Sequence, residues 1–230
     1  MKTLLIQHND VEGPGYISDW IKQHHGSLKI VRPDQSDQLK RIRTEQFDLL
    51  VIMGGNESAN EMDKAWINEE RDLIRRAHQA RKPIFGVCLG AQQLAKALGA
   101  LVEKQNPAEI GWLPVQKSDQ CSIDGIPDQL TVLHWHQDQF TLPVNSHRLF
   151  KSQLDVNQGF ILDNMIGIQF HLEMKPDEVK KLTQADHQLI EASDAPNAVQ
   201  QTAEQINQHP VPSDNQKVLF KLLDRITNQN

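Results

Sequence analysis

The sequence contains little cysteine, few aromatic residues and no long apolar run. Its 230 residues include two cysteines, and phenylalanine, tryptophan and tyrosine together make up 5%. Two cysteines form no disulfide framework, and no stretch approaches the roughly 18 apolar residues of a membrane-spanning helix. Residues 1–6 are too few for the apolar core of a secretion signal. We therefore expect a protein of the reducing cytoplasm that makes no membrane contact.

An excess of positive charge is also missing. Lysine and arginine number 24 against 30 acidic residues, which gives a net charge of −6. Binding to a nucleic-acid backbone requires concentrated basic residues, so we expect no nucleic-acid partner. The sequence has no Gly-x4-Gly-Lys-[Ser/Thr] phosphate loop, and we expect no cofactor. The 38% hydrophobic content is enough for the core of an α/β domain.

Apolar runs alternate with amphipathic segments through the first 100 residues, which is typical of an α/β fold with a mostly parallel central sheet and flanking helices. Residues 101–170 contain more strand patterns. The expected strands are 4–6, 28–31, 48–53, 83–87, 112–115, 131–134, 150–152, 159–162 and 165–170, and the expected helices cover 17–24, 66–77 and 91–98.

The chain changes character after residue 175. Proline and acidic residues at 176–178 predict a helix start, a polar loop follows near 194–196, and residues 218–226 predict a final amphipathic helix. We expect residues 1–175 to form one α/β domain and residues 176–230 to be a helical extension packed on it. A lid or a subunit contact is the alternative use of this extension.

The segment Gly86-Val87-Cys88-Leu89-Gly90 has the spacing of a nucleophile elbow, with cysteine as the nucleophile. A strand that turns sharply into a helix exposes its nucleophile at the turn, and a Cβ on either flanking glycine would collide with backbone. The helix N-terminus favours the thiolate form of Cys88. A buried turn with an inert thiol is the alternative. Cys121 lies in a polar stretch without glycines, and we expect no role for it.

A base for this nucleophile is found more than eighty residues later. His171 and Glu173 follow the apolar run 165–170, and residues two apart at a strand end project to the same side. A cysteine nucleophile needs an imidazole to take its proton, and the imidazole needs an acceptor to orient it. The pair therefore matches a catalytic base and its orienting carboxylate.

Four sequence blocks occur in a characteristic order. With these blocks the chain resembles the class I, triad-type glutamine amidotransferases, which have a flavodoxin-like fold, and in particular stand-alone proteins similar to the amidotransferase domain of GMP synthase. The blocks are Val51-Ile52-Met53-Gly54-Gly55, Gly86-Val87-Cys88-Leu89-Gly90-Ala91-Gln92, Trp135-His136-Gln137-Asp138 and Gln169-Phe170-His171-Leu172-Glu173.

The resemblance implies a role for each matching residue. Cys88 would be the nucleophile, His171 the general base and acid, and Glu173 the residue that orients His171. Binding of the oxyanion and of the glutamine-like substrate would fall to a second set. Its members are Gly54, Gly55 and Leu89 for the oxyanion, and Gln92 and His136 for the α-amino and carboxylate groups.

Two positions depart from the family pattern. Asn56 follows Gly54-Gly55 where the family usually has proline, and Leu172 stands between His171 and Glu173 where the family also has proline. Asparagine makes the first loop less rigid, whereas leucine keeps the spacing of the pair.

Three functions remain open. The first is hydrolysis of the γ-amide of glutamine through a glutamyl thioester, with ammonia released or passed to a synthetase partner subunit. The second is a γ-glutamyl peptidase or hydrolase with the same triad. The third is a non-catalytic binding or regulatory subunit, which the intact set of Cys88, His171 and Glu173 disfavours.

The alternate histidines His134 and His136 could share one face of a strand. No further histidine or cysteine stands nearby at zinc-ligand spacing, so we expect no metal.

Overall fold

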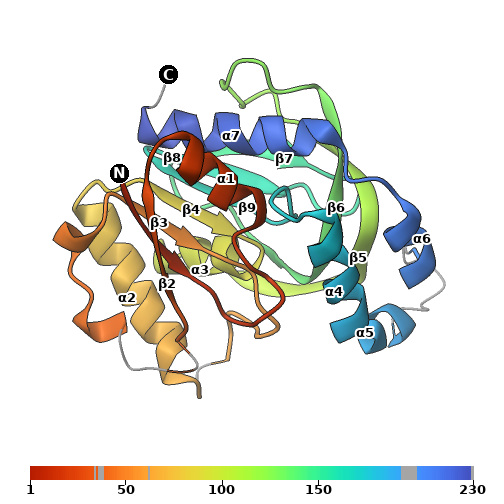
Figure 1. Ribbon diagram of the computed structural model, residues 1–230, viewed down its shortest axis with the longest axis horizontal. Coiled ribbons are helices and arrows are strands. Elements are labelled where there is room, and N and C mark those ends of the chain that lie inside the picture. The colour runs from red at the N-terminus through yellow and green to blue at the C-terminus, as the bar shows by residue number, and fades with distance from the viewer. Residues whose placement is uncertain (34, 36–38, 62, 193–200, 229–230) are drawn as a thin grey trace.

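The computed structural model describes residues 1–33, 35, 39–61, 63–192 and 201–228, and these form nine strands, seven α-helices and two 3-10 helices (Figure 1). The strands are β1 (Lys2–Ile6), β2 (Ser27–Val31), β3 (Leu49–Ile52), β4 (Ile84–Val87), β5 (Val102–Lys117), β6 (Gln129–Phe140), β7 (His147–Lys151), β8 (Gly159–Leu162) and β9 (Met165–Ile168). The helices are α1 (Gly15–Gln23), η1 (Leu39–Arg41), η2 (Thr44–Gln46), α2 (Ala65–Gln79), α3 (Leu89–Ala97), α4 (Pro176–Ala185), α5 (His187–Ala192), α6 (Ala203–Gln208) and α7 (Ser213–Thr227).

The strands form one sheet in the order β2-β1-β3-β4-β9-β8-β7-β5-β6. The first five strands of this order run parallel, and the neighbours from β9 to β6 pair antiparallel. The expected α/β fold with flanking helices is confirmed, but the sheet is mixed, with parallel pairing in one half. The reason is clear at β8 and β9, which are joined by Asp163 and Asn164, because so short a turn can connect only antiparallel strands.

Helices cover both faces of the sheet. Helices α1 and α7 lie side by side over one face, and their apolar residues share a core with Leu5 and Val51 (Figure 1). Helices α2 and α3 cover the other face, where they pack on Leu4 and Ile52. Neighbouring strand residues thus point into opposite cores, which explains why the central strands β3 and β9 are buried at every position rather than alternating.

The predicted helices correspond to α1, α2, α3, α4 and α7. The sequence predicts only 112–115 of β5 and 131–134 of β6, whereas both strands are far longer, and it predicts no helix at α6. The loop expected near 194–196 lies outside the described residues. None of the helices described is long and apolar enough to cross a membrane.

The carboxyl ends of β1, β3, β4 and β9 meet at one edge of the sheet. Cys88 directly follows β4, Gly54 follows β3 by two residues, and His171 follows β9 by three. This edge is where ligands generally bind in α/β sheets, since the loops that leave the strand ends are free to carry functional side chains.

His8, just beyond β1, links three elements at this edge. Its Nε2 lies 2.8 Å from Glu70 Oε2 on α2, and its Nδ1 lies 2.9 Å from the carbonyl oxygen of Gly54. The ring also stacks on Trp66 at 5.0 Å. Burial lowers the pKa of His8, but the charge and hydrogen bond of Glu70 outweigh it and raise the pKa to about 9. The imidazolium therefore donates to both partners and holds the Gly54 loop in place.

This arrangement predicts a stability that falls as the pH becomes alkaline. The folded-state pKa of His8, about 9, lies above the unfolded value near 6.5. The stabilisation is therefore complete below about pH 6.5 and is lost as the pH rises through about 9, and its size is about 3 kcal/mol. Denaturant unfolding across this range should show the decline in the parent and in His147→Gln, which changes an exposed histidine. An equal decline in His8→Gln would contradict the assignment.

Candidate active site

Cys88 sits in a strained turn between β4 and α3. Its backbone has φ 50° and ψ −110°, a conformation that residues with a side chain rarely adopt. A Cβ on Gly86 would lie 2.8 Å from backbone atoms of Gly90, and one on Gly90 would lie 2.1 Å from the carbonyl oxygen of Ile52. The expectation that both flanking glycines are needed for steric reasons is confirmed. The bond from the Cys88 amide to the carbonyl of Ile168, at 2.8 Å, secures the turn to β9.

His171 and Glu173 form a buried pair. The Nδ1 of His171 lies 2.7 Å from Glu173 Oε1, and both residues are at most 2% exposed. The backbone fixes each of them, because the His171 amide donates to the Leu133 carbonyl and the Tyr16 amide donates to the Glu173 carbonyl. Gly15 permits this approach of α1, since a Cβ there would lie 2.0 Å from the Glu173 carbonyl oxygen. The bond at Nδ1 leaves Nε2 as the nitrogen available for proton transfer.

Burial favours the protonated form of the Cys88 thiol. Cys88 is 6% exposed, and desolvation raises the pKa of its thiol, although the interaction with His171 opposes this. The charge of Glu12 raises the pKa further. The Leu89 amide at the helix N-terminus lowers this pKa, as the sequence predicts, but the loss of water outweighs it and the net shift favours the thiol. The sulfur also lies 3.8 Å from the Trp135 carbonyl oxygen and 3.7 Å from Gln169 Nε2.

At His171, the neighbouring groups outweigh the effect of burial on the pKa. Burial lowers the pKa of His171, but the charge of Glu173, the contact with Cys88 and the hydrogen bond to Glu173 together raise it well above 6.5. His171 and Cys88 each shift the pKa of the other, so the two groups are electrostatically coupled, and His171 Nε2 has no hydrogen-bond partner among the described residues. The arrangement can thus move a proton from sulfur to imidazole when the thiol attacks.

Glu12 stands beside this pair, although no sequence motif indicates it. Its Oε2 lies 4.0 Å from His171 Nε2, and the residue is 4% exposed. The side chain of Asn9 donates to Glu12 Oε1 at 2.9 Å. A Cβ on Gly54 would lie 1.7 Å from Glu12 Oε2, so the glycine makes room for the carboxylate. Burial raises the pKa of Glu12 itself. The only sequence signal for Glu12 is its place in the loop after the first strand.

A cleft of about 310 Å³ opens in front of Cys88. Carboxylates dominate its polar lining, against a single lysine, and the remaining lining includes four of the residues expected to bind the substrate or the oxyanion. The acidic residues are Glu12, Glu57, Glu61, Asp138 and Asp186, the lysine is Lys104, and the four expected residues are Gly55, Leu89, Gln92 and His136.

The predicted oxyanion and substrate residues are placed differently in depth. Gly55 and Leu89 touch the cleft, and a Cβ on Gly55 would lie 2.9 Å from the Leu89 side chain. Gly54 is fixed behind them by the bond from His8 to its carbonyl. The Gln92 amide donates to Gln169 Oε1 at 3.2 Å, next to the sulfur. Gln92 therefore supports the wall of the cleft and also faces it.

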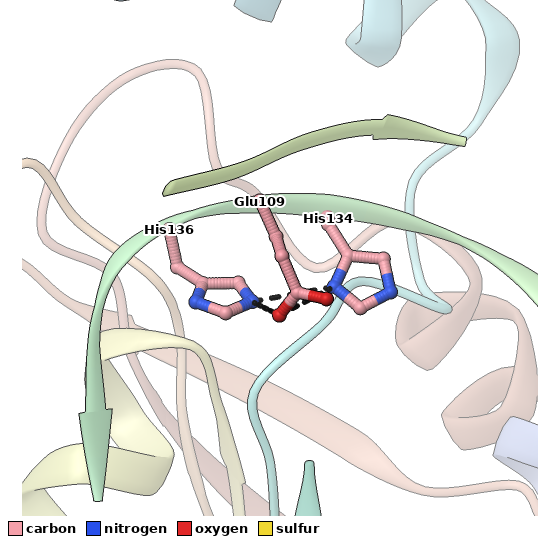
Figure 2. Close-up of side chains that lie close together, drawn as sticks. All are labelled: Glu109, His134 and His136. Atoms are coloured by element: carbon pink, nitrogen blue, oxygen red, sulfur yellow. Dashed lines mark hydrogen bonds and ion pairs between the residues drawn. The ribbon is translucent and has the colours of Figure 1, made fainter. Parts of the chain in front are cut away.

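A second group of polar residues lies on the strands beside the cleft. Glu109 on β5 and His134 and His136 on β6 are all buried and bring one ligand-type atom each to within 4.8 Å of the others (Figure 2). Burial raises the pKa of Glu109, but His136 and His134 outweigh it and lower this pKa to about 2. Burial lowers the pKa of His134 to about 3. These three residues could hold a metal ion. The sequence pattern indicates only the two histidines, because Glu109 is distant along the chain.

Comparison with known proteins gives consistent matches. Residues 17–190 match the family described as glutamine amidotransferase class-I. The chain is 27% identical over 236 residues to the glutamine amidotransferase-like protein YfeJ of Salmonella typhimurium, covering 99% of this chain and 98% of that protein. It is 31% identical to a glutamine-hydrolysing GMP synthase subunit from Sulfolobus acidocaldarius, over 64% of this chain and 77% of that protein.

A solved structure matches the whole chain. A glutamine amidotransferase from Thermotoga maritima superposes with a TM-score of 0.83 at 30% identity, covering 100% of this chain and 99% of that one. The similarity therefore extends through the C-terminal helices.

The position of Glu12 predicts a measurable effect on the thiol. Its charge raises the pKa of Cys88, so Glu12→Gln should lower the pH midpoint of Cys88 alkylation by iodoacetamide by about one unit. Glu57→Gln, an identical change elsewhere in the cleft, is the matched control. The measurement is the alkylation rate against pH in a Cys121→Ala background. Equal midpoints in the two variants would show that Glu12 does not act on Cys88.

Proposed function

The chain belongs to the class I glutamine amidotransferase family, and from this premise we propose that it hydrolyses the γ-amide of a γ-glutamyl substrate through a thioester on Cys88. The observation that supports this most directly is Cys88 at the strained turn together with the buried His171, whose Nδ1 bonds Glu173 and whose Nε2 has no hydrogen-bond partner among the described residues. With glutamine as substrate, the products are glutamate and ammonia.

Acylation begins with proton transfer from Cys88 Sγ to His171 Nε2. The sulfur attacks the γ-carbonyl carbon, and the amides of Gly55 and Leu89 donate to the oxyanion that forms. Glu173 stabilises the imidazolium through its 2.7 Å bond. Collapse of the tetrahedral intermediate breaks the carbon–nitrogen bond. The leaving nitrogen takes the proton from Nε2, which leaves a glutamyl thioester and a neutral imidazole.

Deacylation uses the same groups in reverse. His171 Nε2 takes a proton from water, and the hydroxide attacks the thioester carbonyl. The carbon–sulfur bond then breaks, and the sulfur recovers the proton. Ammonia released in the first step has two possible fates: it diffuses away, or a synthetase partner consumes it. The GMP synthase relative is named as one subunit of that enzyme, which supports a search for such a partner.

The charge of the cleft favours a second candidate, the hydrolysis of γ-glutamyl compounds in which the leaving amine carries a separate cationic group. Two lysines partly balance the five carboxylates of the cleft. Lys104 pairs with Asp138 at 3.2 Å, and Lys64 pairs with Glu57 and Glu61 from outside the cleft. Glu12 and Asp186 add two further carboxylates to the lining. Such a surface attracts a cationic group and repels an acidic one.

The cysteine assignment predicts unequal effects of the two cysteines. Cys88→Ala should lower ammonia release from glutamine by at least about 1000-fold, because the covalent step is lost, whereas Cys121→Ala should keep the parent rate. Circular dichroism checks that both variants fold. Equal rates in the parent and Cys88→Ala would exclude the mechanism. A parent that hydrolyses neither glutamine nor γ-glutamyl dipeptides would instead favour a binding subunit.

The charged cleft predicts a substrate order. Among γ-glutamyl dipeptides, kcat/KM for γ-glutamyl-lysine should exceed that for γ-glutamyl-glutamate by at least about tenfold at low salt, and added salt should reduce the ratio. Asp186→Asn removes one carboxylate from the lining and should lower the ratio without changing the rate on glutamine. Turnover of glutamine alone would reject the second candidate and leave the first intact.

A further inference from the structure

Strand pairing explains how Glu109, His134 and His136 come together. Glu109 on β5 lies opposite His136 on β6, and His134, two residues along β6, faces the same side of the sheet. A register shift between Lys104 and Glu109 precedes this pair, so an irregular stretch of β5 brings the carboxylate into line with the two rings. The three residues are between 0% and 3% exposed. The cluster is buried, and of its three residues His136 alone also lines the cleft in front of Cys88.

The three facing atoms form a nearly regular triangle. His134 Nδ1 lies 3.2 Å from His136 Nε2, which lies 3.4 Å from Glu109 Oε2, and the third side, Glu109 Oε2 to His134 Nδ1, is 3.8 Å. A triangle with these sides has a centre about 2.0 Å from each corner, which is the length of Zn–N and Zn–O bonds. Figure 2 shows the carboxylate between the two rings, with these nitrogens turned toward it.

Hydrogen bonds orient His136 and Glu109 for a cation, whereas His134 Nε2 has no hydrogen-bond partner among the described residues. The Nδ1 of His136 donates to the Asp138 carbonyl at 3.1 Å, so its Nε2 carries the lone pair in the neutral ring. Ser152 donates to Glu109 Oε1 at 2.6 Å, which turns Oε2 toward the rings. A bond from the second nitrogen of a ligating histidine and bonds to a ligating carboxylate are the usual supports of a metal site.

Buried acceptors without donors are a second, independent sign. Gln105 Oε1, Gln158 Oε1 and Asp155 Oδ2 are buried and lack a hydrogen-bond partner among the described residues. The amides of Gln105 and Gln158 both contact Glu109 Oε2, at 3.1 and 2.6 Å. A half-turn of the Gln158 amide would present its Oε1 at the same place, where a cation is the partner it lacks.

We propose that Glu109, His134 and His136 bind one zinc ion, with the Gln158 amide oxygen as a fourth ligand. Two imidazoles and a carboxylate form a ligand set that suits Zn²⁺, and the neutral rings with one carboxylate leave the occupied site with a charge of +1. The ion ties β5 to β6 behind the catalytic cleft. Strand β6 also carries Trp135, whose carbonyl touches the Cys88 sulfur, so the ion holds one wall of the site.

The test is a zinc titration of chelator-stripped Cys88→Ala protein, in which the nucleophile cannot bind the metal. We expect one Zn²⁺ per chain, measured against a competing chromophoric chelator, and a rise in the thermal unfolding midpoint on binding. Glu109→Gln and His134→Gln, each added to this background, should weaken binding at least about 100-fold. His147→Gln changes an exposed histidine on β7 and should bind as tightly as the parent.

Several outcomes overturn the proposal. One is an absence of stoichiometric binding, which would mean that a proton alone bridges the cluster. Another is equal affinity in folded Glu109→Gln or His134→Gln, which would place the ion elsewhere. If neither variant folds, X-ray absorption at the zinc edge of the Cys88→Ala protein decides. Two imidazoles with only oxygen ligands support the site, and a sulfur ligand or fewer imidazoles refute it. None of these readouts depends on catalytic activity.

Discussion

The burial of Cys88 together with His171 is the constraint on which this site depends. Cys88, His171 and Glu173 are each at most 6% exposed, so the charged form of each loses its hydration. For the base, the 2.7 Å bond to Glu173 makes up this loss. The sulfur has no equivalent partner, and its pKa is raised. The protonation states of the thiol and the imidazole are therefore coupled, and the titration belongs to the pair rather than to either residue.

The mixed sheet explains why the two walls of the cleft come from different architectures. The parallel half brings Cys88 and Gly55 to a common edge, as strand ends do in α/β folds. The antiparallel half contributes the long strand β6, which supplies Trp135, His136 and Asp138. His171 stands where the halves meet, because β9 pairs with β4 on one side and with β8 on the other, and its amide bonds to β6. The base is thus fixed to both walls.

Local patterns predicted the parts of this protein that local geometry determines. The glycines around Cys88 are required by contacts within one turn, and the apolar strands are buried on both faces. Glu109 could not be found in this way, because it reaches the histidines through a pairing across 27 residues of sequence that an irregular stretch of β5 sets. The net preference of Cys88 for the thiol could not be predicted for a similar reason. The helix N-terminus is visible in the sequence, but the burial that opposes it is not.

Glu12 connects substrate charge with the reactivity of the thiol. The buried Glu12 carboxylate lies 4.0 Å from His171 Nε2, and its charge raises the pKa of Cys88. A positive group that binds beside Glu12 offsets the charge of this carboxylate and so lowers the pKa of Cys88. The proposed substrates carry such a group, as an α-ammonium or a cationic leaving amine. Binding of such a substrate would therefore favour the thiolate that attacks the carbonyl carbon.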